Sequence, residues 1–361
     1  MSSPLLRLVV LYGGVSAEHD VSRTSAAQVL AAADRAKYSL VPVGIAKDGT
    51  WHRNDFAAAA LAAGDELGRR LDVEGPVVNP VDVLTGTGEV ETVVLPLMHG
   101  PHGEDGTVQG MLELFKIPYV GCGVLSSALC MDKAMAKEVA ARAGIPQCSW
   151  ISLREGVDDP REVAARAVSD LGLPVYVKPA NMGSSVGVTC ADTVEKLDLA
   201  IAEALRYDDV VVIEEEVSAR EIEVAVLGNG VPETTVPGEI LAGAFYDYEK
   251  KYLTGEAELV IPAELSDEAA SAVREIAARA FTALRCTGMA RVDFFYEENG
   301  RGWLLNEVNT IPGFTPSSMY PKMWEATGLA YPDLIDRLIE LARATYRRRS
   351  GFSTESISPE Q

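Results

Sequence analysis

The chain has 361 residues, of which 47% are apolar and 24% are charged, a composition that is typical of globular proteins and excludes a disordered or fibrous chain. Aspartate and glutamate outnumber lysine and arginine by 53 to 32, which gives a net charge of −21. Such an acidic surface repels phosphate backbones and anionic lipids, so we expect no nucleic-acid partner and no membrane-surface partner. At about 150 residues per domain, the length predicts roughly two to three domains.

Cysteine usage and apolar runs bear on the cellular compartment. The five cysteines are odd in number and form no C-x-x-C pair, so the sequence supports neither a disulfide framework nor a zinc ribbon. Residues 1–12 lack a basic region followed by a long apolar core, as a signal peptide requires. The longest uncharged stretch, residues 117–131, is too short to span a bilayer. We therefore expect a soluble, reduced protein of the cytoplasm.

The first third of the chain predicts an open α/β domain. Residues 5–12 form an apolar, β-branched run that ends at Gly13-Gly14, which is typical of a buried parallel strand. Further elements of this domain are predicted as a helix at 21–33, strands at 40–45 and 92–98, a helix that includes 112–115, and a short strand at 119–120.

The remaining two thirds alternate helical and strand patterns. Helices are predicted at 131–143, 266–284 and 332–346, and strands at 175–178, 210–214 and 221–227. Residues 238–259 are polar, rich in tyrosine and without periodicity, which predicts a long functional loop. Asn299-Gly300 between two alternating runs predicts a hairpin formed by 290–296 and 303–308. Residues 350–361 are expected to be a frayed tail.

The predicted hairpin carries the sharpest chemical signal. Arg291 and Asp293 lie two residues apart on its first strand, and Glu307 and Asn309 lie two apart on its second. Side chains at this spacing share one face of a strand, so a guanidinium, two carboxylates and an amide can gather there. Magnesium prefers such oxygen ligands and commonly links carboxylates to substrate phosphates. A solvated surface ion pair is the alternative interpretation, and the glycine- and proline-rich residues 309–318 weaken it because they suit a shaped loop.

Four other segments are weaker signals. Lys178 precedes the loop 179–187, whose glycines and serines can wrap phosphate, although its spacing is neither a Walker A loop nor a dinucleotide fingerprint. Three acids, 214–216, end a strand and indicate exposure or an adenine contact. His99 and His102 have a metal-like spacing but no further ligand nearby, so an ordinary loop is favoured. Residues 13–20 follow the first strand, where α/β sheets bind ligands.

Together these segments resemble the D-alanine–D-alanine ligases of the ATP-grasp superfamily. The matching segments occur in family order and cover about residues 8–342: GGVSAEHDVS at 13–22, LMHGPHGEDGTVQG at 97–110, MDK at 131–133, VKPANMGSSVG at 177–187, FYDYEKKY at 245–252, GMARVDFF at 288–295 and NEVNTIPGFTPSSMYP at 306–321. Met182 lies where the family varies. The resemblance implies an N-terminal α/β domain at 1–124, a central ATP-grasp subdomain at 125–226, a C-terminal ATP-grasp and metal-binding subdomain at 227–349, and a flexible tail at 350–361.

The resemblance also implies roles for individual residues. For ATP it implies phosphate contacts from Lys133, Lys178, Ser184, Ser185 and Lys251, and adenine and ribose contacts from Glu214, Val217 and Glu221. For metal it implies two Mg²⁺ or Mn²⁺ ions on Asp293, Glu307 and Asn309, with Glu307 bridging them. For D-alanine it implies an ammonium anchor at Glu18 near His99, loop closure by Ser184 and Tyr252 with Glu18, an oxyanion site of Arg291 and the Gly313 amide, and a carboxylate site of Ser318 and the Met319 amide.

The implied reaction joins two D-alanine molecules through an acyl phosphate, with release of ADP and phosphate, for peptidoglycan precursors. ATP and D-alanine are then the partners, and a homodimer is implied. A D-alanine–D-lactate-type depsipeptide ligase on the same fold is the runner-up. Another ATP-grasp carboxylate–amine ligase is disfavoured by Glu18 and residues 245–252. A catalytically silent nucleotide-binding regulator is disfavoured, because such a protein would be expected to have lost a metal ligand or Arg291, and this chain keeps both.

Overall fold

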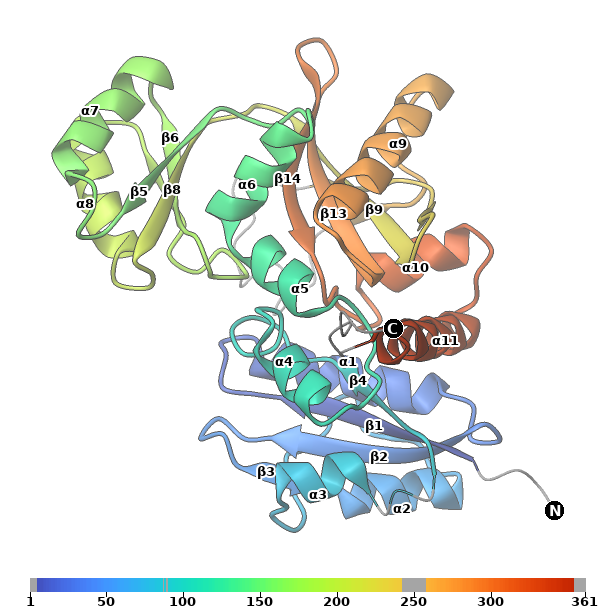
Figure 1. Ribbon diagram of the computed structural model, residues 1–361. Coiled ribbons are helices and arrows are strands. Elements are labelled where there is room, and N and C mark those ends of the chain that lie inside the picture. The colour runs from blue at the N-terminus through green and yellow to red at the C-terminus, as the bar shows by residue number, and fades with distance from the viewer. Residues whose placement is uncertain (1–4, 87, 89, 242–257, 354–361) are drawn as a thin grey trace, which may run out of the picture.

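The computed structural model describes residues 5–86, 88, 90–241 and 258–353. Three sheets organise these residues, and Figure 1 shows them as three lobes that follow one another along the chain. The N-terminal lobe carries a largely parallel sheet, and the central and C-terminal lobes carry antiparallel sheets. The predicted combination of an open α/β domain with an ATP-grasp part of two subdomains is confirmed.

The N-terminal sheet has the strand order β3-β2-β1-β4, and only β3 runs antiparallel to its neighbour. Its strands are β1 (Leu6–Gly13), β2 (Tyr38–Ile45), β3 (Trp51–Arg53) and β4 (Thr92–Pro96). Its helices are α1 (His19–Ala32), α2 (Asp55–Ala63), α3 (Pro80–Thr85) and α4 (Thr107–Leu114). Because the ends of β1 and β4 meet at one edge, the loops at 13–18 and 97–106 lie together there.

The C-terminal helix returns to cover this first sheet. Leu8 and Val10 of β1 share one core with Leu334 and Leu338 of α11 (Tyr331–Ser350), and Val9 and Leu11 point into a second core on the other face. Figure 1 shows α11 lying between the N-terminal lobe and the C-terminal sheet. The first and third lobes are therefore joined by a continuous apolar core.

The central sheet has the strand order β5-β8-β6-β7. Its elements are β5 (Trp150–Arg154), α7 (Pro160–Asp170), β6 (Val175–Pro179), β7 (Thr189–Ala191), α8 (Val194–Ala204) and β8 (Val210–Glu215). Val177 and Ile213 pack in the core that α7 and α8 cover. Because strand side chains alternate, their neighbours Lys178 and Glu214 lie on the opposite face.

The C-terminal sheet follows the order β12-β11-β9-β13-β14, with β10 paired to β9. Its strands are β9 (Arg220–Gly228), β10 (Glu233–Thr234), β11 (Gly238–Leu241), β12 (Glu258–Val260), β13 (Gly288–Glu297) and β14 (Gly302–Asn309). Its helices are α5 (Val124–Met131), α6 (Lys133–Arg142), α9 (Asp267–Ala283) and α10 (Met319–Ala326). Val224 and Val292 face the core under α9, so the charged residues that alternate with them face the other way.

Several predicted elements need correction. The expected loop at 238–259 is wrong at its ends, since β11 and β12 pair there as antiparallel strands. The predicted helix at 131–143 is present as α6, which begins at Lys133 rather than at Met131, because the Asp132 side chain caps it by accepting from the Met135 amide. The pair 119–120 makes only an isolated bridge to Val94 rather than a strand. Most of the predicted tail lies outside the described residues, and α11 continues through Ser350.

The sheets also bear on the expected subdomain limits. The expected limit between residues 226 and 227 falls inside β9, whose partners β11 and β13 belong to the C-terminal sheet. The change of sheet occurs in the linker between β8 and β9, residues 216–219. None of the helices in the described ranges is long and apolar enough to cross a membrane. The five cysteines, all described, are free thiols.

Candidate active site

The loop after β1 brings a carboxylate to the edge of the N-terminal sheet. Gly13 donates its amide to Ser22 Oγ at 2.7 Å, and that hydroxyl donates to the Leu97 carbonyl at 2.6 Å, which ties the loop to the end of β4. Glu18 stands at the first position before α1 and is 8% exposed. A buried carboxylate at a helix N-terminus benefits from the positive end of the helix dipole.

Glu18 reaches from the N-terminal lobe to the phosphate-type loop of the central lobe. Ser184 Oγ donates to Glu18 Oε1 at 2.5 Å, across 166 residues of sequence. Ser184 and Ser185 adopt φ of +50° and +59°, in the left-handed region that is unfavourable for residues with a side chain. Gly183 lies so close that an added Cβ would be 2.9 Å from Glu18 Oε2, so the loop fits around the carboxylate. The predicted Glu18–Ser184 contact is present.

His99 joins the N-terminal lobe to the loop that follows β14. It is 4% exposed, and its Nδ1 lies 3.0 Å from the Ile311 carbonyl and 3.3 Å from Glu104 Oε1. Both neighbours are acceptors, so Nδ1 carries a proton and donates to them. Burial opposes a charged ring, but Glu104 and Glu18 outweigh it and raise the pKa of His99 above its usual value. His102 lies apart in an exposed turn, as the loop interpretation predicted.

Two of the three lysines that are predicted to contact phosphate, Lys133 and Lys178, lie on α6 and β6. Lys133 Nζ donates to the Met182 carbonyl at 2.6 Å, and so holds the loop that carries Ser184. Lys178 Nζ lies 2.6 Å from Glu214 Oε2 on the neighbouring strand. Burial and the nearby Lys178 charge lower the pKa of Lys133, although Glu307 opposes this.

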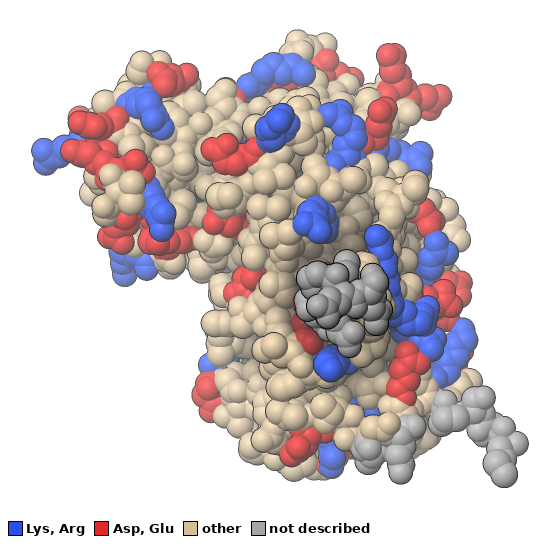
Figure 2. All heavy atoms as spheres, in the orientation of Figure 1, with Lys and Arg blue, Asp and Glu red and all other residues tan. Residues whose placement is uncertain are grey.

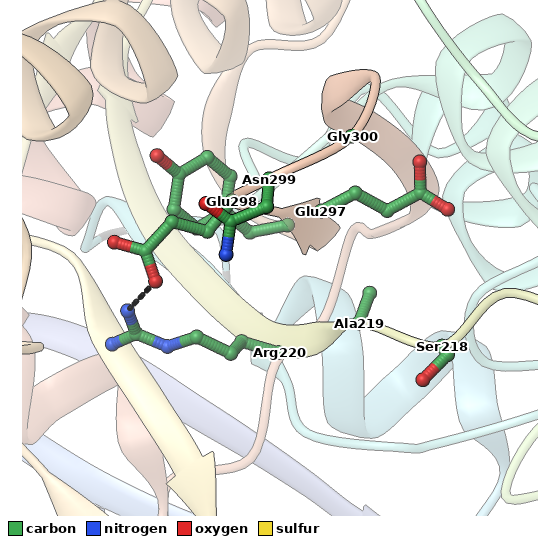
Figure 3. A pocket seen from close by; sticks show the side chains of 8 residues that line it. Ser218, Ala219, Arg220, Glu297, Glu298, Asn299 and Gly300 are labelled. Carbon is green, nitrogen blue, oxygen red and sulfur yellow. Dashed lines mark ion pairs between the residues drawn. The ribbon is translucent and has the colours of Figure 1, made fainter.

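The residues that are predicted to contact adenine and ribose lie where the chain passes from the central sheet to the C-terminal sheet. Glu214 lies near the end of β8 and is 3% exposed; burial opposes its charge, but two lysines outweigh that effect and hold its pKa at about 2. Val217 lies half-buried in the linker, and Glu221 follows at the start of β9. The linker borders a shallow, open pocket of about 510 Å³, in which Arg220 and Glu298 approach to 3.7 Å (Figure 3). Arg220 already pairs with Glu239, so this pocket has no spare cation.

The hairpin gathers its polar residues as predicted. Asp293 pairs in register with Glu307, and Arg291 pairs with Asn309, on neighbouring strands. Arg291 makes two hydrogen bonds to the Asp293 carboxylate, at 2.7 and 2.8 Å. Asn309 Nδ2 donates to Asp293 Oδ2 at 2.8 Å, which leaves its amide oxygen for another partner. Two carboxylates and an amide oxygen are a donor set that fits magnesium.

This donor set alone does not enclose a metal. Among the described residues, no cluster of three or more His, Cys, Asp or Glu side chains has the arrangement of a metal site. The hairpin supplies two carboxylates and an amide, and magnesium commonly completes its octahedral shell with water and substrate phosphate. Water or substrate phosphate would have to supply the remaining ligands of a metal bound there.

The loop after β14 prepares a second anion site. Ser318 precedes α10 (Met319–Ala326), and an added Cβ at Gly313 would lie 2.6 Å from Ser318 Oγ. Ser318 Oγ accepts from the Thr315 amide at 2.9 Å, which fixes the loop ahead of the helix. The amides at a helix N-terminus point outward and favour an anion such as a carboxylate. Gly313, Ser318 and Met319 are therefore adjacent, as the predicted roles require.

Two segments of the chain match the two parts of one family. Residues 7–122 match the family described as "D-ala D-ala ligase N-terminus", and residues 139–340 match "D-ala D-ala ligase C-terminus". The chain belongs to the D-alanine–D-alanine ligase family. The predicted resemblance is thereby confirmed.

Relatives and solved structures of the family cover nearly the whole chain. The D-alanine–D-alanine ligase of Staphylococcus carnosus is 45% identical over 93% of this chain and 95% of that protein, and that of Caldicellulosiruptor bescii is 43% identical over 96% and 98%. The D-alanine–D-alanine ligase structure from Coxiella burnetii has a TM-score of 0.81 at 37% identity, with 96% of each chain covered. The VanG D-Ala:D-Ser ligase of Enterococcus faecalis also reaches 0.81, at 34% identity, with 94% and 100% covered.

Two of the residues with roles implied by the family resemblance, Lys251 and Tyr252, lie outside the described residues, so their positions stay predictions. Conversely, three charged residues that border the site were not predicted. Glu223 Oε2 lies 3.0 Å from Arg291 Nε, Lys137 Nζ lies 2.9 Å from Glu214 Oε1, and Glu104 contacts His99. The alternation Glu221-Ile222-Glu223 was a usable signal, because it places Glu223 on the same face as Glu221. Lys137 lies one helical turn after Lys133, which also placed it on the same face.

Proposed function

We propose that this chain joins two D-alanine molecules into D-alanyl-D-alanine for peptidoglycan synthesis, with ATP as the second substrate, and that the residues described above do so. Ligation of D-alanine is the activity of the family to which the chain belongs. The observation that carries the residue assignment is the Glu18–Ser184 hydrogen bond at 2.5 Å. It joins a buried carboxylate, suited to an ammonium group, to the loop that is suited to phosphate.

Phosphoryl transfer is the first step. A carboxylate is a poor electrophile, and transfer of the ATP γ-phosphoryl group to the first D-alanine gives an acyl phosphate with a good leaving group. Lys133 on α6 and Lys178 on β6 are proposed to contact the phosphates and to offset their charge. Asp293, Glu307 and the Asn309 amide oxygen would hold magnesium. When bound, magnesium offsets the negative charge that phosphoryl transfer concentrates on the phosphates.

Amide formation is the second step. The second D-alanine, held through its carboxylate by Ser318 and the Met319 amide, attacks the acyl phosphate with its amine. The tetrahedral oxyanion is met by the Arg291 guanidinium and the Gly313 amide, groups whose interaction strengthens as the charge develops. Phosphate leaves, and closure over the site keeps water from hydrolysing the acyl phosphate. Lys251 and Tyr252 are proposed to take part in that closure.

The choice of acceptor is the open question within this function. A D-Ala:D-Ser ligase has the same TM-score as a D-alanine–D-alanine ligase, so the fold does not discriminate between acceptors. The test is mass-spectrometric product analysis with D-alanine alone and then with excess D-lactate or D-serine at pH 6 and pH 8. We expect D-alanyl-D-alanine as the main product under all of these conditions. Predominant depsipeptide at both pH values would instead support a D-alanine–D-lactate-type ligase. Predominant D-alanyl-D-serine would support a D-alanine–D-serine ligase.

A control variant separates binding of ATP from recognition of D-alanine. Glu18→Gln keeps the size of the side chain and removes the charge that is proposed to anchor the first ammonium. We expect this variant to bind ATP and to lose D-alanine-dependent ADP release. Cytoplasmic location and a homodimeric assembly stay predictions, which fractionation and analytical ultracentrifugation would test.

A further inference from the structure

One buried cation beside the site has no part in the reaction as described so far. Lys137 lies on α6, one turn after Lys133, and is 3% exposed. Its Nζ lies 2.9 Å from Glu214 Oε1 and 3.5 Å from the Cys148 thiol. A lysine is almost never this buried unless it is paired, so Glu214 is the reason that the site tolerates it.

Glu214 is held from both sides by different lysines. Lys137 Nζ lies 2.9 Å from Glu214 Oε1, and Lys178 Nζ lies 2.6 Å from Glu214 Oε2. The group of three carries a net charge of +1. One carboxylate thus has two counter-ions, although one would be enough to neutralise it.

The additional positive charge affects how Lys178 can bind a phosphate. The Lys178 ammonium has three N–H donors, but a phosphate that draws its positive charge away from Glu214 weakens the ion pair between them. With Lys137 present, the carboxylate that Lys178 leaves behind still has a buried counter-ion. Without Lys137, the same change would leave the Glu214 carboxylate without a counter-ion. Glu214 is only 3% exposed, and an unpaired buried charge is strongly unfavourable.

We infer that Lys137 is a positioning residue. It remains paired with Glu214 when ATP binds, and it thereby allows Lys178 to contact the phosphates of ATP. This inference rests on the proposed function, in which Lys178 contacts ATP. Lys137 itself needs no contact with the nucleotide. Its effect should therefore depend on the Glu214 charge, and it should act on ATP binding rather than on the chemical step.

The test compares the full-length wild type with Lys137→Met, Glu214→Gln and the double variant. Affinity for the magnesium complex of a non-hydrolysable ATP analogue is measured by calorimetry, and kcat is measured at saturating ATP and D-alanine. We expect Lys137→Met to weaken binding by at least ~30-fold, as for a stranded buried charge, and to change kcat by less than about threefold. In the Glu214→Gln background, the same substitution should change affinity by less than about threefold, because no carboxylate remains to be stranded.

Two further variants complete the design. Lys137→Arg keeps the positive charge and should restore affinity to within about fivefold of wild type. Lys196→Met is the matched control. Lys196 on α8 also forms an ion pair, with Asp192, but both side chains of that pair are exposed. This variant should leave the affinity unchanged.

Several results would overturn the inference. One is equal affinity of wild type and Lys137→Met; another is an equal loss in both backgrounds, which would mean that Lys137 acts on ATP without Glu214. If Lys137→Met does not fold, the comparison of Glu214→Gln with the double variant decides, and a loss of more than about tenfold there contradicts the inference. A wild type that binds no ATP analogue contradicts the proposed function and this inference with it, whereas normal wild-type binding with an unaffected Lys137→Met contradicts only the role of Lys137.

Discussion

Replacing Ser184 by alanine tests the contact that joins the N-terminal and central lobes. The variant removes a hydroxyl that donates to Glu18 Oε1 at 2.5 Å and keeps the rest of the loop. A hydrogen bond to a charged group contributes about 1.5–3 kcal/mol. At about 1.4 kcal/mol per tenfold, its loss should lower kcat/KM for D-alanine by roughly 10- to 150-fold.

The assay is D-alanine-dependent ADP release at saturating ATP, together with ATP binding in the absence of D-alanine. The Ser184 hydroxyl donates to Glu18, so we expect the phosphate contact implied for Ser184 to come from its backbone amide, which alanine keeps, and ATP binding should change by less than about threefold. Ser184→Gly removes the same hydroxyl and relieves the positive φ of +50°, so it separates the hydrogen bond from backbone strain. Ser169→Ala, at an exposed position on α7, is the control for an ordinary serine. A Ser184→Ala variant with normal kcat/KM for D-alanine and weakened ATP binding would refute the reasoning.

Three other predictions address charge. Glu307→Gln should lower kcat by at least ~10²-fold, because it removes a preorganised charge at the proposed metal face; near-normal turnover in saturating magnesium would contradict its role. Arg291→Ala should lower kcat and kcat/KM together with little change in ATP affinity, and a rise in the KM for ATP alone would make it a nucleotide contact instead. The pKa of Glu214 is about 2 in the folded chain against an ordinary 4.5, so the stability that it contributes is present above pH 4.5 and is lost as the pH falls toward 2. Urea unfolding between pH 5 and pH 3 should therefore cost the wild type about 2 kcal/mol more than Glu214→Gln, and equal losses would contradict this.

The hairpin shows what a sequence predicts well. Period-two spacing placed Arg291 and Asp293 on one face of a strand, and Asn299-Gly300 marked the turn, so the hairpin and its polar face followed from local rules. The pairing of Asp293 with Glu307 was not predicted, because it depends on a β-bulge between Asp293 and Phe294 that shifts the register by one residue. The helix at 266–284 was predicted nearly to its ends, because Ser266 caps it by accepting from the Ala269 amide. Short-range chemistry determines both features, and short-range chemistry is visible in a single sequence.

Contacts across lobes could not be derived in the same way. Nothing local indicates that Glu18 meets Ser184, 166 residues later; family resemblance supplied that pair, and the structure places it at 2.5 Å. Burial of Lys137 was also hidden, since an isolated helical lysine is typical of a solvated face. The strands β11 and β12 escaped prediction because each is short and gains its hydrogen bonds from distant partners, Glu223 and Val260 among them.

The electrostatics of the site resolve an apparent conflict between the net charge and the substrate. A chain of net charge −21 should repel a polyanion, and on the central lobe in Figure 2 acidic side chains are interspersed with basic ones. At physiological ionic strength, however, exposed charges are screened beyond about 8 Å, whereas buried charges are screened much less. Lys133, Lys137 and Lys178 are held among the carboxylates of Glu214 and Glu307, where a low dielectric strengthens every interaction. The chain therefore needs no basic surface to bind ATP, because a few buried lysines act at short range, where the charge of the outer surface has little effect.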